Sequence, residues 1–170
     1  MSVVICAKTV CPIVEKIDSL TVAHLTTESV RHALEGLAHV TSWVESQKLV
    51  LTRRLQELAS SSPSVIPTQV IATACGITRS EAKRGVTRVS TLALVPQLEM
   101  ALTAGHVSIA HVDAVTHAMS HLSDSEKQKV AAQGNWMNMV ASHTTPDNFA
   151  RAVRRAVQQV HSDSGLTPLE

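Results

Sequence analysis

The segment that follows Thr27 runs to about Ala59 without a proline and carries apolar side chains at a heptad-like spacing. Positions 30, 34, 37, 41, 44, 48, 51, 55 and 58 follow alternating steps of four and three, and only Thr41 and Lys48 among them are polar. We call the apolar seven the heptad stripe: Val30, Leu34, Leu37, Val44, Leu51, Leu55 and Leu58. About 30 helical residues make a rod of roughly 45 Å. Such a rod is expected to pack along a helical partner, either in its own chain or in a second copy.

The composition favours a compact helical protein. The chain has 170 residues, of which 44% are apolar and 2% aromatic, so the core must consist mainly of aliphatic side chains, which suits closely packed helices. Three aromatic residues are too few for a base-stacking platform that binds single-stranded nucleic acid. The net charge of +1 gives no overall attraction to nucleic acid or membrane, so any such binding must come from local patches.

Prolines, glycines and capping residues divide the remainder into short helices. Thr78 with Glu81 and Ser123 with Glu126 have the spacing of capping boxes, and Pro67, Pro96 and Pro146 suit first helical turns. We predict an all-α fold of about eight helices, with one long N-terminal rod helix and an array of shorter helices. The expected parts are an N-terminal helix and rod (1–59), a Ser/Pro linker (60–67), the array (68–165) and a tail (166–170).

Residues 68–93 have the outline of a helix-turn-helix unit, in which Gly76 supplies the turn. The second helix is expected to bury Ala82, Val86, Val89 and Ala93, and segment 76–91 has a net charge of +3. Its polar face predicts a nucleic-acid contact made by Arg79, Lys83, Arg84, Thr87 and Arg88, with Thr87 nearest a base edge. The alternative is a solvated helix face that carries a Glu81–Arg84 pair.

A second basic cluster is expected on the last helix, at Arg151, Arg154 and Arg155. If the fold places it beside the first basic face, the two would form one continuous strip for phosphates. The alternative is an ordinary solvated face.

The sequence points to no reaction. His106, His111, His117 and His121 lack the acid or thiol partners of a zinc site, and we interpret their spacing as adventitious. Motifs for serine hydrolases, zinc proteases and phosphate-binding loops are absent, so we expect no enzyme activity, cofactor, metal or small-molecule substrate for this chain. Three scattered cysteines, no signal-peptide pattern and no membrane-length apolar run predict a cytoplasmic protein.

Residues 73–115 resemble the actinobacterial domain of unknown function 222, also called the 13E12 repeat family. The resemblance is carried by Gly76, Thr78, Glu81, Ala82, Arg84, Leu92, Pro96, Ala101, Leu102, Gly105, Val107, Ser108 and His111. The final TPDNFARAVRRAV is also similar to the end of that domain. In the family this domain usually precedes an HNH endonuclease module, and no His-Asn-His module is found here, so the chain is expected to be either a front part or a stand-alone version.

Two functional hypotheses follow. The first is a non-catalytic N-terminal domain of an HNH-endonuclease-like protein that binds or positions duplex DNA through the two basic clusters. The second is a structural module that forms homodimers through the heptad stripe and contacts no nucleic acid. Both are compatible in one molecule, because symmetric dimers commonly present paired reading helices.

Overall fold

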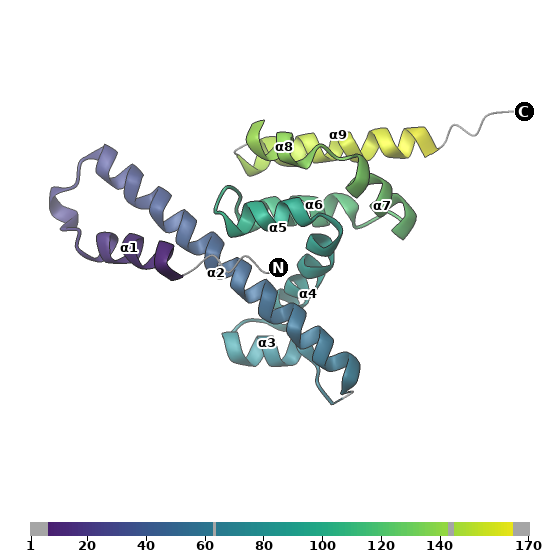
Figure 1. Cartoon of the computed structure of the whole chain (residues 1–170), viewed down its shortest axis with the longest axis horizontal. Helices are drawn as coiled ribbons and strands as arrows, with labels where there is room; N and C mark the ends of the chain where they lie inside the picture. Colours follow the sequence, from purple (N-terminus) through teal and green to yellow (C-terminus); the bar gives the residue numbers. More distant parts are fainter. Residues whose placement is uncertain (1–6, 63, 143–144, 165–170) are drawn as a thin grey trace, which may run out of the picture.

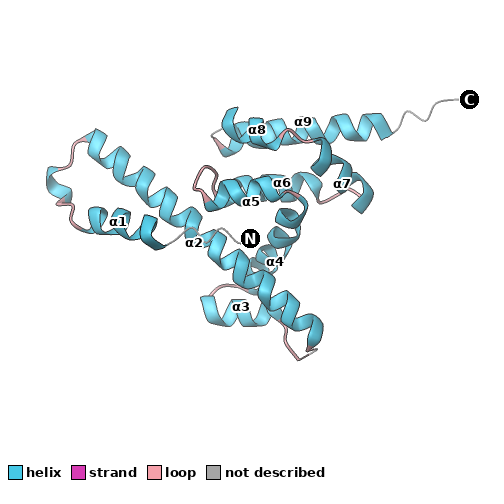
Figure 2. Cartoon of the chain, in the orientation of Figure 1, coloured by secondary structure: helices cyan, strands magenta, loops and turns pink. Residues whose placement is uncertain are grey.

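The computed structural model describes residues 7–62, 64–142 and 145–164. This part of the chain contains nine α-helices, one short 3-10 helix and no strand, which confirms the expected all-α fold (Figure 2). The elements are α1 (Ala7–Asp18), η1 (Val22–His24), α2 (Thr27–Ser61), α3 (Pro67–Cys75), α4 (Arg79–Leu94), α5 (Pro96–Thr103), α6 (Ile109–Met119), α7 (Asp124–Gln133), α8 (Trp136–Ser142) and α9 (Pro146–Ser164).

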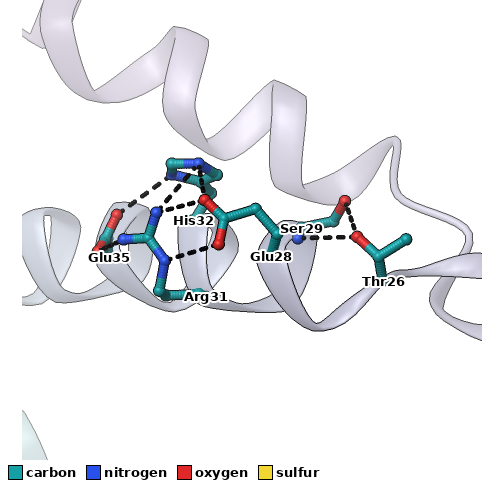
Figure 3. Close-up of polar contacts among 6 residues, drawn as sticks. All are labelled: Thr26, Glu28, Ser29, Arg31, His32 and Glu35. Carbon is teal, nitrogen blue, oxygen red and sulfur yellow. Dashed lines mark hydrogen bonds and ion pairs between the residues drawn. The ribbon is translucent and has the colours of Figure 1, made fainter.

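Helix α2 is the long rod, and local signals fix where it begins (Figure 3). It has 35 residues and is about 52 Å long. The hydroxyl of Thr26 caps the first turn by accepting a hydrogen bond from the backbone N–H of Ser29 at 3.2 Å. In the next turns Arg31 pairs with both Glu28 and Glu35, and its hydrogen bonds hold the pKa of Glu28 below the ordinary value. All these contacts lie within α2 and its N-cap residue Thr26, so they stabilise the start of the helix itself.

The heptad stripe is not the face through which α2 packs in its own chain. Six of its seven residues are exposed, from 37% for Val44 to 65% for Leu51, and only Leu55 is half-buried. The buried residues of α2 are instead Ser42, Ser46, Leu49 and Thr52. These mostly small side chains let α4 and α5 pack closely on the rod. For the described residues, the interpretation of the stripe as an intrachain bundle seam is therefore wrong.

The rod and the shorter helices share one buried core. In Figure 1, α1 lies along the N-terminal half of α2 and α3 along its C-terminal half, and α4 leads from the rod to the layer of α5 and α6. Helix α9 packs on α6 in a further layer. Leu49 of α2 belongs to the same cluster as residues from α4 to α9, among them Leu92, Val95, Leu98, Leu102, Val112, Val115, Trp136, Phe149 and Val153.

Two features of the chain differ from the sequence expectation. Helix α2 continues to Ser61, which shortens the expected linker. Helix α8 was not expected, although Asn135, a residue type that favours the N-cap position, directly precedes it. Tertiary burial accounts for its place, since Trp136 is only 2% exposed and its indole N–H donates to the carbonyl of Ala131 at 2.9 Å.

Two glycines give a matched test of this local account. Gly76 ends α3 with φ +63°, and a Cβ added there would meet no atom within 4 Å. Gly76→Ala is therefore expected to destabilise the fold by about 1 kcal/mol through backbone strain alone. Gly85 lies inside α4 with similar free space, so Gly85→Ala is expected to stabilise it by up to about 1 kcal/mol. Urea unfolding measures both, and shifts of the same sign would contradict the assigned backbone conformations.

Candidate functional site

A polar groove lies between α4 and α6. Helix α4 contributes Ser80, Lys83, Arg84 and Thr87, and α6 with the residue after it contributes Asp113, Thr116, His117 and Ser120. The groove thus combines two permanent cations, four hydroxyl groups, one imidazole and one carboxylate. Three of the residues predicted to contact nucleic acid meet in it.

The turn between α3 and α4 determines where α4 begins, and α4 carries one side of the groove. Gly76 adopts the left-handed conformation after α3, and the hydroxyl of Thr78 then caps α4 by accepting from the N–H of Glu81 at 3.2 Å. Only half of the predicted capping box is formed, because the Glu81 carboxylate is bonded to arginines instead. Helix α4 buries Ala82 and Val89 as expected. It also buries Arg88, Thr91 and Leu92, whereas Val86 is half-buried and Ala93 is exposed.

Arg88 is where the structure departs most from the expected basic face. Its residue exposure is 8%, and its Nε and Nη2 atoms donate to the two carboxylate oxygens of Asp113 at 2.7 and 2.9 Å. Its Nη1 atom donates to Glu81 at 3.0 Å. Hydrogen bonds to Asp113 are the main cause that raises the pKa of Arg88 above its ordinary value, against the opposing effect of burial. This guanidinium ties α4 to α6 and is not presented on the exposed face with the other cations.

The remaining cations of α4 are open to solvent. The side chain of Arg84 is 65% exposed although it pairs with Glu81 at 3.1 Å. Arg79 and Lys83 are exposed and form no ion pair with any residue that the structure describes. Thr87 is exposed too, and its hydroxyl donates to the carbonyl of Lys83 at 3.1 Å. The solvated face with a Glu81–Arg84 pair therefore exists, and the same residues remain accessible to a ligand.

The electrostatic balance at this face is modestly positive. The four cations of α4 (Arg79, Lys83, Arg84 and Arg88) stand against two carboxylates (Glu81 and Asp113), which leaves +2. Because Arg88 is bonded to both carboxylates, neither of them stands unpaired beside the exposed cations. An anion that approaches the groove therefore meets little local repulsion.

The contribution of α6 was not predicted from the sequence. The hydroxyl of Thr116 lies 2.9 Å from that of Thr91, and His117 and Ser120 extend the rim of the groove. Of Thr116, His117 and Ser120, only His117 was considered from the sequence, in the context of a zinc site. The spacing of Asp113, Thr116, His117 and Ser120 along one helix face is a usable signal, but only once α6 is known to lie beside α4.

The second basic cluster lies on a different part of the molecule. Arg151, Arg154 and Arg155 are exposed on α9, which packs on α6. Arg155 lines a separate groove with residues of the α7–α8 region such as Asn135 and Met139. Arg151 donates to the side chain of Asn148 at 2.7 Å, and Arg154 to the carbonyl of Ala150 at 3.3 Å. The structure does not bring this cluster into the α4–α6 groove.

The histidines do not gather around a common point. His106, His117 and His121 are exposed, whereas His111 is buried, caps α6 through the N–H of Ser108 at 3.1 Å and lies against Phe149 with ring centroids 5.1 Å apart. Within residues 7–62, 64–142 and 145–164, no group of three or more His, Cys, Asp or Glu side chains is arranged to hold a metal ion.

The comparisons add no relative. No protein-family model, curated protein or solved structure that was compared matches this chain. The resemblance to the 13E12 repeat family remains a prediction from the residues that carry it. Of the helices in the described residues, none has both the length and the apolar character needed to cross a membrane.

Proposed function

We propose that this chain is a non-catalytic helical module that binds or positions duplex DNA through the α4–α6 groove. One observation carries the proposal: the groove is lined by exposed cations and hydroxyl groups, and its carboxylate, Asp113, is already bonded to Arg88. Lys and Arg, together with Ser and Thr hydroxyls, are the side chains that most often contact DNA phosphates. The helix-turn-helix outline of α3 and α4 supports the same function.

The proposed roles follow from exposure. Arg79, Lys83 and Arg84 contact phosphates, and Thr87, further along the exposed face of α4, lies nearest a base edge. Arg88 has no direct role, because its guanidinium is bonded to carboxylates. Three phosphate contacts support weak, salt-dependent binding in the range of about 10⁻⁴ to 10⁻⁶ M. This is the range of binding to DNA without sequence preference.

The resemblance to the 13E12 repeat family extends this proposal to a biological setting. That domain accompanies HNH endonuclease modules, so we propose that the α4–α6 groove holds the duplex while a nuclease module cleaves it. The gene that encodes this chain tests this extension. We expect it to encode an HNH module after the helical domain.

A salt titration of duplex binding tests the interface itself. For three phosphate contacts, a plot of log affinity against log salt concentration is expected to have a slope of about −2.7. The double substitution Lys83→Gln with Arg84→Gln is expected to reduce the magnitude of this slope by about 1.8. Fluorescence anisotropy with a labelled duplex measures both slopes.

Arg54 provides a matched control for Arg84. It also pairs with a glutamate three residues away, Glu57, and its side chain is 64% exposed against 65% for Arg84, but it lies on the rod. Arg54→Gln is expected to leave the slope unchanged. If Arg54→Gln lowered the slope as much as substitution of Arg84, the effect would come from the overall charge of the chain and not from the groove. A wild-type chain that binds no duplex at low salt would overturn the proposal.

A further inference from the structure

We propose that the heptad stripe of α2 is the docking surface for a second copy of this chain, and that the two α2 helices pack antiparallel. This inference is independent of DNA binding. It starts from the exposure of the stripe: Leu34 is 60% exposed, Leu51 65%, and Val30, Leu37 and Leu58 between 40% and 44%. Apolar side chains repeated over a helix of this length are costly to leave in water.

The period of the stripe selects another helix as its occupant. Steps of four and three place the apolar side chains along a narrow seam, and a seam with this period is complementary to a second helix of the same period. An identical chain supplies such a helix, and pairing about a two-fold axis lets each copy bury the same surface. A flat or irregular partner would leave much of this seam uncovered.

The surface is large enough for a specific homodimer. From their exposed fractions, the six exposed stripe residues leave on the order of 500 Å² of surface per copy, so two copies would bury about 1,000 Å². Beside the C-terminal half of the stripe lies a groove between α2, α3 and α4. Its apolar lining includes Leu51 and Leu55 of α2 and Val70 and Ile71 of α3. With this groove included, the interface falls at the lower end of the size range of specific complexes.

The charge on the seam decides the orientation. Lys48 occupies a stripe position, and its only salt bridge within the described chain is to Glu45 on the same helix at 2.8 Å. A parallel pair would place Lys48 against Lys48 of the second copy, which is unfavourable. Val44 lies at the midpoint of Thr27–Ser61, so an antiparallel pair centred there separates the two lysines. It also brings the region of Leu34 and Leu37 against that of Leu51 and Leu55 of the second copy.

Sedimentation equilibrium of the full chain tests the dimer. The wild type is expected to sediment with twice the 18.2 kDa mass of one chain. Leu37→Glu and Leu51→Glu are expected to weaken association at least about 100-fold and give the mass of a single chain, because each buries a charge in the seam. Both positions are exposed in the single chain, so circular dichroism is expected to show an unchanged fold.

Met100→Glu is the matched control, because Met100 is 61% exposed but belongs to α5 and not to the stripe of α2. This variant is expected to remain dimeric. A monomeric wild type at the highest soluble concentration overturns the proposal, and equal dissociation of the Met100→Glu variant overturns its assignment to the stripe.

A distance measurement tests the orientation. A spin label at Glu57→Cys, with Cys6, Cys11 and Cys75 replaced by serine, is expected to give a separation of about 40 Å in the antiparallel dimer, since the labels lie at opposite ends of the helix pair. A separation of roughly 10–20 Å indicates parallel helices and contradicts the antiparallel arrangement.

Discussion

Replacement of Arg88 by methionine is expected to lower the free energy of unfolding by about 2–3 kcal/mol. The guanidinium is buried and forms three hydrogen bonds to Asp113 and Glu81, so its removal leaves both carboxylates without their partner. Loss of one member of a buried ion pair costs about 3–5 kcal/mol. The expected value is smaller because the side chains of Asp113 and Glu81 are 45% and 35% exposed and can regain water. Urea unfolding followed by circular dichroism measures the change.

The matched variant Arg84→Met is expected to change stability by less than about 0.5 kcal/mol, because Arg84 forms an exposed pair with the same Glu81. The two variants thus separate folding from ligand contact: Arg88→Met affects stability, and Arg84→Met affects the salt dependence of duplex binding. If Arg88→Met kept the wild-type stability and lost duplex binding, Arg88 would belong to the interface after all.

The direction of the pKa shift of Arg88 predicts how its contribution to stability depends on pH. Because the pKa of folded Arg88 is raised, its stabilising effect is fully present below the ordinary arginine value and is lost only as pH rises through the raised value. Between neutral pH and about pH 10 the difference in stability between wild type and Arg88→Met is therefore expected to stay constant.

Phe149→Ala is expected to destabilise the protein by about 3–5 kcal/mol, the largest effect among the predicted changes. Phe149 is fully buried where α9 packs on α6, and its ring contacts that of His111 at a centroid distance of 5.1 Å. Truncation removes the contacts of the ring and leaves a cavity in the layer that carries α6, one wall of the proposed DNA groove. Urea unfolding measures the loss.

Met100→Ala serves as the control, because Met100 is 61% exposed and its truncation is expected to cost less than about 0.5 kcal/mol. Phe149→Leu is expected to recover more than half of the loss, since the aliphatic side chain fills part of the cavity. A cost below about 1 kcal/mol for Phe149→Ala would mean that this contact does not hold α9 on α6.

Local rules were sufficient to predict most of the helices. The hydroxyl caps at Thr26 and Ser123, the prolines at the start of α3, α5 and α9 and the left-handed Gly76 act within a few residues of the chain. Helix α8 was not predicted, although Asn135 precedes it, and the burial of Trp136 against residues from other helices holds this helix in the core. Only half of the candidate groove could be predicted from the sequence. Lys83, Arg84 and Thr87 share one face of α4, whereas Thr116 and His117 reach the groove from α6, and the sequence does not show that α6 lies beside α4.

The sequence by itself determined that this protein is helical, where most helices begin and end, and which residues form the heptad stripe and the exposed cations of α4. Only the tertiary structure decided that α2 packs through Ser42, Ser46 and Thr52, and that Arg88 is bonded to Asp113, 25 residues away. The physical reason is range. Capping, backbone conformation and helical period depend on neighbouring residues, whereas the choice of a buried face and the partner of a buried charge depend on which distant surfaces the fold brings together.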